Sequence, residues 1–250
     1  MAETVQIGDY FIEEHTNFPE LISALRKGFA SREFIIPQRH HHDFPNPETE
    51  VDSTLLLMPA WQPGKNVGVK MVTINPGNSR FDLPSIQGIY VLMNAMNGTP
   101  KAMLEAKSLT AKRTAAASAL ASSFLSKENA SSLLMIGTGA LSTNLIKAHC
   151  SVRPIQKVYV WGRNPTKARS ICNQLGNEDF DTRPISDIEE KISEVDIISC
   201  ATLSKTPLVL GKYLRPGQHI DLVGAFKKDM READDETITK ASVFVDTFQG

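Results

Sequence analysis

The first pattern that could carry chemistry is a pair of glycines at the end of an apolar run. Residues 133–142 read LLMIGTGALS, and a helical pattern follows at 143–148. A strand, a glycine turn and a helix in this order are typical of a dinucleotide-binding fingerprint, in which the backbone approaches a pyrophosphate and a small third residue lets the helix pack on the strand. A glycine turn of any α/β protein would give the same pattern. The candidate cofactor-binding residues of this turn are Gly137, Thr138, Gly139, Ala140, Leu141 and Ser142.

The end of the next predicted strand bears on which dinucleotide would bind. The strand predicted at residues 158–161 ends in Trp161, Gly162, Arg163 and Asn164, about 25 residues after Gly137. A site for NAD usually has Asp or Glu here to bind the ribose 2′-hydroxyl, whereas an arginine suits the 2′-phosphate of NADP. These four residues are therefore candidate cofactor contacts, with NADP(H) preferred. An arginine that only stacks on adenine would also accept NAD(H).

Two cations lie in sequence contexts where a positive charge is unexpected. Lys70 is the one charge in the apolar stretch 67–74, and Arg113 lies in the first turn of the alanine-rich stretch 111–125. A lysine in such a strand more often faces solvent. A cation in the first turn of a helix is mildly unfavourable against the helix dipole unless an anion lies there too. The residues alone leave surface and anion-binding roles open.

Three consecutive histidines, His40 to His42, raise the question of a metal site. Consecutive residues of an extended chain point to alternate faces, so they rarely bind one ion together. We expect an exposed polar loop here, and no metal site.

The elements that must position these residues change in character near residue 110. Before it, the pattern predicts strands at 10–12, 34–36, 54–59, 67–74 and 88–93 and an amphipathic helix at 18–29, which together form a β-rich α+β domain over residues 1–110. After it, helical stretches at 111–125, 143–148 and 165–175 alternate with strands at 133–136, 158–161, 196–202, 219–223 and 243–245. Such alternation predicts an α/β fold, a Rossmann-like doubly wound parallel sheet over residues 111–250.

The predicted sheet adds further candidate residues. Ligands of doubly wound sheets bind at the carboxyl ends of the strands, so the loops after the strands near 200 and 220 should lie beside the glycine turn. The cofactor-binding residues expected from these loops are Ala201, Thr202, Leu203, Val223 and Gly224.

Composition excludes several classes of partner. With 27 basic and 28 acidic residues, the chain has no charge excess that would favour a nucleic acid or a membrane surface. The N-terminal residues do not resemble a signal peptide, and no apolar run has transmembrane length. The three cysteines form no CxxC pair, and we interpret them as reduced core residues of a cytoplasmic protein.

Taken together, the motifs resemble those of the ornithine cyclodeaminase/mu-crystallin family. The resemblance covers most of residues 35–235 in the right order. The matching pieces are PQR at 37–39, LMP at 57–59, GVK at 68–70, PGN at 76–78, PSIQG at 84–88, LTAKRTAA at 109–116, the glycine turn, GAF at 224–226 and MRE at 230–232. The family includes cyclodeaminases, alanine dehydrogenases and reductases of cyclic imino acids and ketimines. The resemblance implies a β-rich substrate and dimerisation domain, a Rossmann domain and a homodimer.

The resemblance also assigns roles to three cations. By motif, Arg39, Lys70 and Arg113 match the residues that bind the substrate carboxylate, and Lys70 and Arg113 are the expected catalytic residues. Three cations that converge need a shared anion to offset their repulsion. A small amino or imino acid would supply it, and an arginine can hold a carboxylate through two hydrogen bonds.

Two departures from the family pattern shape the expected reaction. Phe226 stands where cyclodeaminases carry an aspartate that handles the substrate amine, so we expect an apolar substrate contact there. We therefore expect NAD(P)H-dependent reduction of a Δ1-pyrroline-2-carboxylate-like imino acid. The alternatives are an ornithine cyclodeaminase that uses NAD+ catalytically and a non-catalytic, crystallin-like protein that binds a nucleotide or another ligand. Family members also usually continue beyond the position of Gly250, so the first domain is expected to lack its usual C-terminal return.

Overall fold

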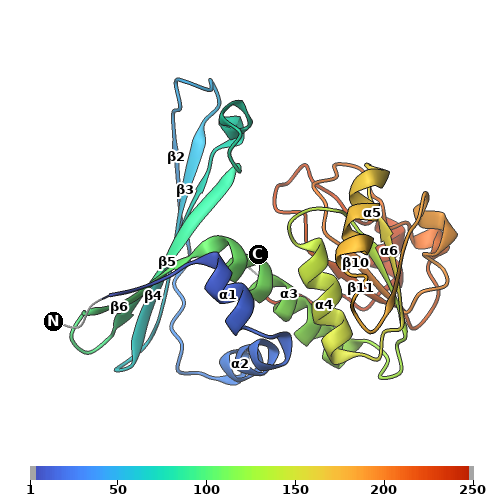
Figure 1. Cartoon of the computed structure of the whole chain (residues 1–250), viewed down its shortest axis with the longest axis horizontal. Helices are drawn as coiled ribbons and strands as arrows, with labels where there is room; N and C mark the ends of the chain where they lie inside the picture. Colours follow the sequence, from blue (N-terminus) through green and yellow to red (C-terminus); the bar gives the residue numbers. More distant parts are fainter. Residues whose placement is uncertain (1–3, 248–250) are drawn as a thin grey trace. The chain divides into compact units, whose positions relative to one another are not determined.

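The computed structural model describes residues 4–247, which form two compact units (Figure 1). The first unit is Met1–Arg113 and the second is Thr114–Gly250, so the division falls inside the long helix α3 (Ala106–Leu125). Within residues 4–247, no helix combines the length and the apolar character that a membrane span requires.

The first unit is built on a six-stranded sheet with the order β1-β6-β5-β4-β3-β2. Strand β1 runs parallel to β6, and the other neighbours are antiparallel. Gly64 and Gly98 provide the positive φ values, 70° and 73°, of the turns after β3 and β5. The strands are β1 (Val5–Ile7), β2 (His40–Phe44), β3 (Ser53–Gln62), β4 (Asn66–Ile74), β5 (Ile86–Asn94) and β6 (Pro100–Glu105), and a 3₁₀ helix, η1 (Pro76–Phe81), joins β4 to β5.

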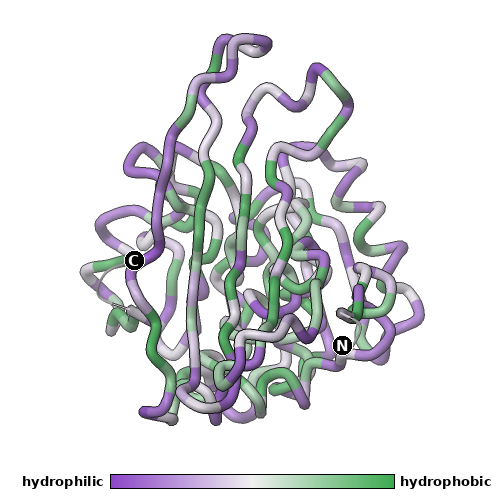
Figure 2. The backbone as a smooth tube through the Cα atoms, turned by 90° about the vertical axis from the view of Figure 1, so that its left-hand side faces the viewer, coloured by the Kyte–Doolittle hydropathy of each residue, from purple (hydrophilic) through white to green (hydrophobic). Residues whose placement is uncertain are grey.

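Two helices, α1 (Asp9–His15) and α2 (Phe18–Ala30), lie on one side of this sheet (Figure 1). Figure 2 views the sheet from the other side, where the strands face the viewer with no helix in front of them. Because side chains alternate along a strand, Gly68, Lys70 and Val72 of β4 share one face. Gly68 and Val72 are buried, so Lys70 lies on a face that the unit covers at least in part.

The start of the first unit differs from the sequence-based expectation. Residues 10–12 were expected to form a strand but belong to α1, because a three-residue apolar run carries too little periodicity to separate helix from strand. The side chain of Asp9 accepts a hydrogen bond from the Ser108 backbone N–H at 2.9 Å. The Lys112 ammonium group donates to the carbonyls of Glu13 (2.8 Å) and Thr16 (3.0 Å) at the end of α1. Two opposite charges therefore tie α1 to the first turns of α3.

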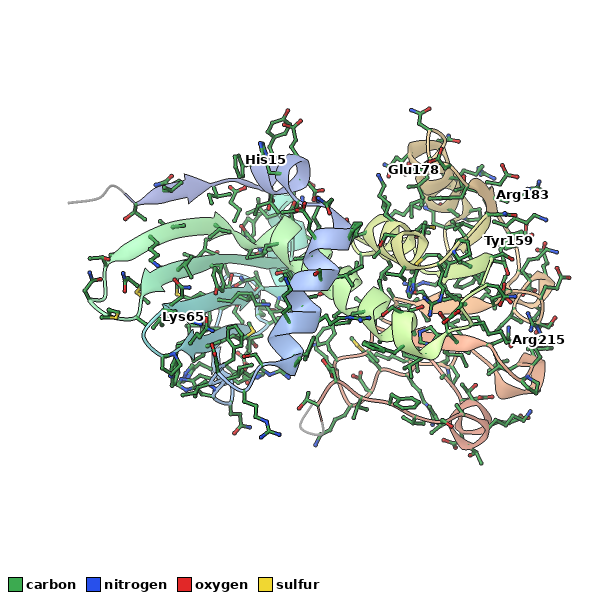
Figure 3. The ribbon with its side chains drawn as sticks, turned by 90° about the horizontal axis from the view of Figure 1, so that it is seen from below. His15, Lys65, Tyr159, Glu178, Arg183 and Arg215 are labelled. Carbon is green, nitrogen blue, oxygen red and sulfur yellow. The ribbon has the colours of Figure 1, made fainter. Side chains whose placement is uncertain are left out.

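The second unit contains a five-stranded, fully parallel sheet with the order β11-β10-β7-β8-β9. Tyr159 and Arg183, labelled in Figure 3, are paired across β8 and β9. The strand order reverses between β7 and β10, which confirms the predicted doubly wound fold class. The elements are β7 (Ser132–Ile136), α4 (Ser142–Val152), β8 (Lys157–Trp161), α5 (Pro165–Gln174), β9 (Asp181–Pro184), η2 (Ile188–Glu190), β10 (Ile197–Cys200), η3 (Gly211–Tyr213), β11 (His219–Leu222) and α6 (Asp235–Lys240).

The core of the second unit explains why its strands could be recognised in the sequence. Leu133, Leu134, Met135 and Ile136 of β7 are fully buried, as expected for a central parallel strand covered on both faces. The last predicted strand is wrong, because residues 243–245 form no strand and their side chains are exposed. Their apolar character is not matched by burial within the described residues.

Candidate cofactor and substrate sites

A cluster of three cations lies in the first unit. Lys70 sits in the middle of β4, paired with Met58 of β3 and Tyr90 of β5. Burial is the largest effect on its ammonium group, and the nearby charges of Arg113 and Arg39 add to it, so that the pKa of Lys70 falls to about 8. The structure therefore brings together the three cations that separate sequence motifs pointed to.

The arrangement of this cationic cluster suits a carboxylate. Arg39 directly precedes β2, Lys70 comes from β4 and Arg113 comes from the second turn of α3, and both arginines are exposed. Three positive charges that lie close together repel one another and are stabilised by a shared anion. A guanidinium group offers two parallel N–H donors that match a carboxylate, while an ammonium group acts as a point charge.

Tyr90 is a neighbour of the cluster that the sequence did not reveal. Its phenol ring lies over Gly68, two residues before Lys70 on the same face of β4, and any side chain at position 68 would collide with the ring. Burial raises the pKa of Tyr90, so the phenol stays protonated. The GVK motif thus combines a cation with the glycine that makes room for this ring.

The turn after β7 contains two glycines, and the structural requirement for glycine differs between the two positions. Gly137 has a φ of 122°, and a side chain there would collide with the carbonyl of Ala201. At Gly139 an added Cβ would meet no atom within 4 Å, so the packing of the protein does not require glycine. The side chain of the fully buried Ser142 donates to the Gly137 carbonyl at 3.0 Å. The open space at Gly139 is what a closely approaching ligand would need.

The helix that follows the turn is built to receive an anion. Leu141 is the N-cap residue of α4 and provides no side-chain cap, so the first N–H groups of the helix are not satisfied by a capping side chain. Free N–H groups and the helix dipole favour a phosphate at this end. Residues 137–142 therefore fit the pyrophosphate of a dinucleotide. Beside them lies a cavity of about 320 Å³ lined by Thr138, Gly139, Ala140, Thr143, Lys167, Ser170, Ile171 and Gln174.

The end of β8 places its predicted contacts in different surroundings. Gly162 packs against Thr138 of the glycine turn so tightly that a side chain there would collide. Arg163 is exposed. Asn164 caps α5 by accepting from the Thr166 N–H at 2.9 Å, and the Trp161 indole donates to the Ser186 carbonyl at 3.2 Å. The side chains of Asn164 and Trp161 are therefore engaged within the protein.

The loops after β10 and β11 lie against each other and beside the turn. Ala201 contacts the position of Gly137, and Val223 donates its N–H to the Cys200 carbonyl at 2.9 Å. A side chain at Gly224 would collide with the backbone of Thr202. The structure thus brings these predicted loop residues together at the carboxyl edge of the sheet. Leu203 and Phe226 of the same loops are 63% and 57% exposed.

Glu232 is a further buried group that sequence reasoning missed. Its carboxylate accepts hydrogen bonds from the loops after β10 and β11. Burial, and then the charge of Glu232, raise the pKa of the neighbouring Cys200 thiol well above its usual range. The thiol therefore stays protonated and unreactive. The MRE motif contains this glutamate, but only the fold shows what it binds.

A second buried polar group belongs to α4. His149 is fully buried, with its Nε2 3.3 Å from a carboxylate oxygen of Asp221, which also accepts from the Ser199 hydroxyl at 2.9 Å. The ring of His219 lies 6.4 Å from that of His149. Burial is the main cause that lowers the pKa of His219 to about 4, and the charges of His149 and Arg153 act in the same direction.

The three histidines at 40–42 begin a strand, β2, and not the expected loop. His40 and His42 share one face, with ring centroids 6.2 Å apart, and His41 on the other face lies 3.1 Å from the Asp43 carboxylate. Pairing with β3, which the polar sequence does not announce, makes this segment extended.

The second unit has a glycine turn at the carboxyl edge of a doubly wound sheet, and the first unit has a mostly antiparallel sheet with a cationic cluster. This combination defines a class of two-unit dinucleotide-binding proteins. Within that class, the chain belongs to the ornithine cyclodeaminase/mu-crystallin family, whose model matches residues 6–249. The family resemblance found in the motifs is thereby confirmed.

Three related proteins illustrate the range. The chain is 37% identical over 239 residues to the Δ1-pyrroline-2-carboxylate reductase of Colwellia psychrerythraea, covering 94% of this chain and 75% of the relative. The Thermococcus litoralis Δ1-pyrroline-2-carboxylate reductase in complex with NADH and L-proline matches with a TM-score of 0.85 and 26% identity, over 95% of this chain and 74% of that one. An archaeal alanine dehydrogenase dimer with bound NAD matches with a TM-score of 0.89 and 26% identity, over 99% and 76%.

The chain spans only part of the length of such relatives. The share ranges from 62% of one curated relative to 75% of another.

Proposed function

We propose that this chain acts in the NAD(P)H-dependent reduction of a small cyclic imino acid, of the Δ1-pyrroline-2-carboxylate type, to the amino acid. The observation that carries the proposal is the convergence of Arg39, Lys70 and Arg113 in one unit of a chain whose other unit has a dinucleotide-binding turn. Relatives that reduce Δ1-pyrroline-2-carboxylate support the choice of substrate class.

The cationic cluster would bind and orient the substrate. Arg39 and Arg113 would hold the carboxylate by their guanidinium N–H groups. Lys70, with a pKa of about 8, is protonated at neutral pH and would hold a proton at Nζ beside the substrate. Orientation and charge, and no covalent step on the protein, are what these residues contribute.

The second unit would hold the cofactor, which supplies the hydride when bound. Residues 137–142 would bind the pyrophosphate, and the loops at 201–203 and 223–224 would complete the site. Arg163, exposed at the end of β8 with no acidic residue beside it, would bind a 2′-phosphate. We therefore propose NADPH as the preferred cofactor, with NADH also accepted.

A homodimer is the proposed assembly. Leu57, Met71 and Ile89 are paired across β3, β4 and β5, so these apolar residues share one face of the first sheet, opposite to the face of Lys70. Ile89 is 36% exposed although it lies in the middle of the sheet. An apolar sheet face of this kind marks an association surface. Sedimentation analysis should show a dimer for the unchanged chain and a monomer for Met71→Glu.

The activity test uses substrate and cofactor directly. Steady oxidation of NADPH in the presence of Δ1-pyrroline-2-carboxylate is expected. Arg113→Ala should lower kcat/KM, by an amount equivalent to about 2–5 kcal/mol of lost transition-state stabilisation, because the substrate charge is left underpaired. Cofactor affinity of that variant should not change. A variant with near-normal kcat/KM would remove Arg113 from the site.

A further inference from the structure

Glu232 is a buried charge whose role the proposed function leaves open. Its side chain belongs to a residue that is 3% exposed. One carboxylate oxygen accepts from the N–H of Thr202 at 2.7 Å and from its hydroxyl at 3.1 Å. The other accepts from the N–H groups of Gly224 at 2.8 Å and Ala225 at 3.3 Å. A buried carboxylate is costly unless it is fully hydrogen-bonded, so this one is held in place by both loops and holds both.

The backbone of Glu232 is fixed to the core. Its carbonyl accepts from the N–H groups of Leu208 and Val209, both at 2.9 Å. Val209 is fully buried and forms a bridge with Ala233, which is 4% exposed. Both residues belong to the hydrophobic cluster that also contains Cys200 at the end of β10. The carboxylate therefore projects from a rigid part of the unit.

The junction that Glu232 makes leaves no room for variation. A Cβ at Gly224 would collide with the backbone of Thr202 and would crowd the Glu232 carboxylate. The two loops thus touch at the point where one carboxylate bonds to both. Loops are ordinarily the most mobile parts of a fold, and this contact restrains two of them together.

The topology says which part of a dinucleotide these loops would meet. The strand order reverses between β7 and β10, and a dinucleotide lies across that crevice. The glycine turn follows β7 and Arg163 follows β8, on the adenosine side. The loops after β10 and β11 lie on the other side of the reversal, which is the side left for the nicotinamide.

We propose that Glu232 is a positioning residue that preforms the seat of the nicotinamide half of the cofactor by locking residues 201–203 to residues 223–225. This inference rests on the proposed function and deepens it, because it assigns the orientation of the cofactor's reactive half to one carboxylate. Loops that are already ordered do not have to be ordered when the cofactor binds, which favours affinity and a single ring orientation.

The test compares NADPH with 2′-phospho-ADP-ribose, which lacks the nicotinamide, as ligands of Glu232→Gln. The amide nitrogen of glutamine must face the N–H groups of one loop, so that loop is released. We expect NADPH affinity to fall about tenfold, the equivalent of one charge-assisted hydrogen bond, while the affinity for 2′-phospho-ADP-ribose stays within about twofold. Calorimetric titration gives both values, and kcat should fall more than the KM for the imino acid rises.

Asp196→Asn is the matched control. Asp196 directly precedes the same strand, β10, and its carboxylate accepts from the Ser131 N–H and the Ser132 hydroxyl, both at 2.9 Å, and pairs with Arg215 at 3.4 Å (Figure 3 labels Arg215). Because it lies at the opposite end of the strand, its loss should lower Tm without changing either affinity.

The inference is overturned if Glu232→Gln binds NADPH as the unchanged protein does, or if it loses NADPH and 2′-phospho-ADP-ribose equally. If that variant does not fold, Glu232→Asp, whose shorter side chain can reach one loop but not both, must show the same selective loss. A chain that binds both ligands but never reduces an imine would refute the proposed function and leave the Glu232 result readable. Normal imine reduction without the selective loss would refute only the inference.

Discussion

At the scale of single residues, Lys70 sets the expected pH dependence of substrate binding. Its pKa, lowered to about 8 by burial and by Arg113 and Arg39, means that the ammonium group loses its proton as pH rises through about 8. The ring nitrogen of pyrrole-2-carboxylate does not titrate in this range. The inhibition constant of this compound should therefore be constant below pH 8 and should rise above it, because binding weakens.

The matched variant is Lys70→Arg, because a guanidinium group stays charged far above this range. In that variant the binding of pyrrole-2-carboxylate should be independent of pH up to about 10. A pH profile shared by both proteins would show that another group titrates and that Lys70 does not bind the carboxylate of the ligand.

Arg163 tests the proposed cofactor preference at the same scale. Arg163→Ala should weaken NADPH by about 1–3 kcal/mol, the range of a charge-assisted contact to phosphate, and should leave NADH nearly unchanged. Fluorescence titration with each cofactor measures both values. Equal losses would mean that the arginine stacks on adenine and does not bind the 2′-phosphate.

At the scale of elements, α3 carries two neighbouring cations with different jobs. Lys112 is 7% exposed and donates to carbonyls at the end of α1, with an ion pair to Glu13 at 3.1 Å, whereas Arg113 is exposed and belongs to the cationic cluster. Lys112→Ala should destabilise the first unit by about 2 kcal/mol, because the partly buried carbonyls of Glu13 and Thr16 lose their donor.

Urea unfolding followed by Trp61 fluorescence in a Trp161→Phe background measures this loss for the first unit. Arg113→Ala is the control, and its activity should fall while its unfolding midpoint shifts less than that of Lys112→Ala. Reversed phenotypes for the two variants would exchange the roles assigned to them.

The elements also show how far sequence reasoning reached. Central parallel strands such as β7 were predictable because burial on both faces makes every residue apolar. Short or polar segments were not. Residues 10–12 became helix because Asp9 and Lys112 fix α1 to α3, and His40 to His42 became a strand because β3 offers hydrogen-bonding partners.

Site residues followed the same rule. Arg39, Lys70 and Arg113 belong to motifs, so their grouping could be expected before any coordinates. Tyr90 and Glu232 could not, because their importance depends on cross-strand register and on loops that meet only in the fold. No spacing along the chain encodes that meeting.

At the scale of the whole chain, the buried His219 predicts sensitivity to acid. His219 keeps a pKa of about 4 in the fold, near Asp221, His149 and Arg153, against about 6.5 when unfolded. Between these values the unfolded chain binds a proton that the folded chain does not, so stability falls as pH drops below 6.5. The loss from pH 7.5 to pH 5 should be about 2 kcal/mol.

His219→Leu should remove most of that loss, as measured by urea unfolding with Trp161 fluorescence in a Trp61→Phe background. His15→Gln, at an exposed position of α1 (Figure 3), serves as the control and should keep the parent's pH dependence. An unchanged slope in His219→Leu would place the acid sensitivity elsewhere.

The reaction needs both units of the chain. Phe226 bears on the choice between imine reduction and conversion of ornithine. An apolar side chain at this position gives an incoming ammonium group no partner, and burying such a group unpaired costs several kcal/mol. Phe226 is 57% exposed on the loop after β11. We expect Phe226→Asp to lower imine reduction, while the unchanged chain has no ornithine-dependent activity.

The most direct measurement is product analysis with Δ1-pyrroline-2-carboxylate and with ornithine in parallel. We expect one proline for each NADPH oxidised with the imino acid, and no ammonia from ornithine with NAD+. Ammonia and proline from ornithine without net consumption of cofactor, and no reaction with the imino acid, would contradict this expectation and identify a cyclodeaminase.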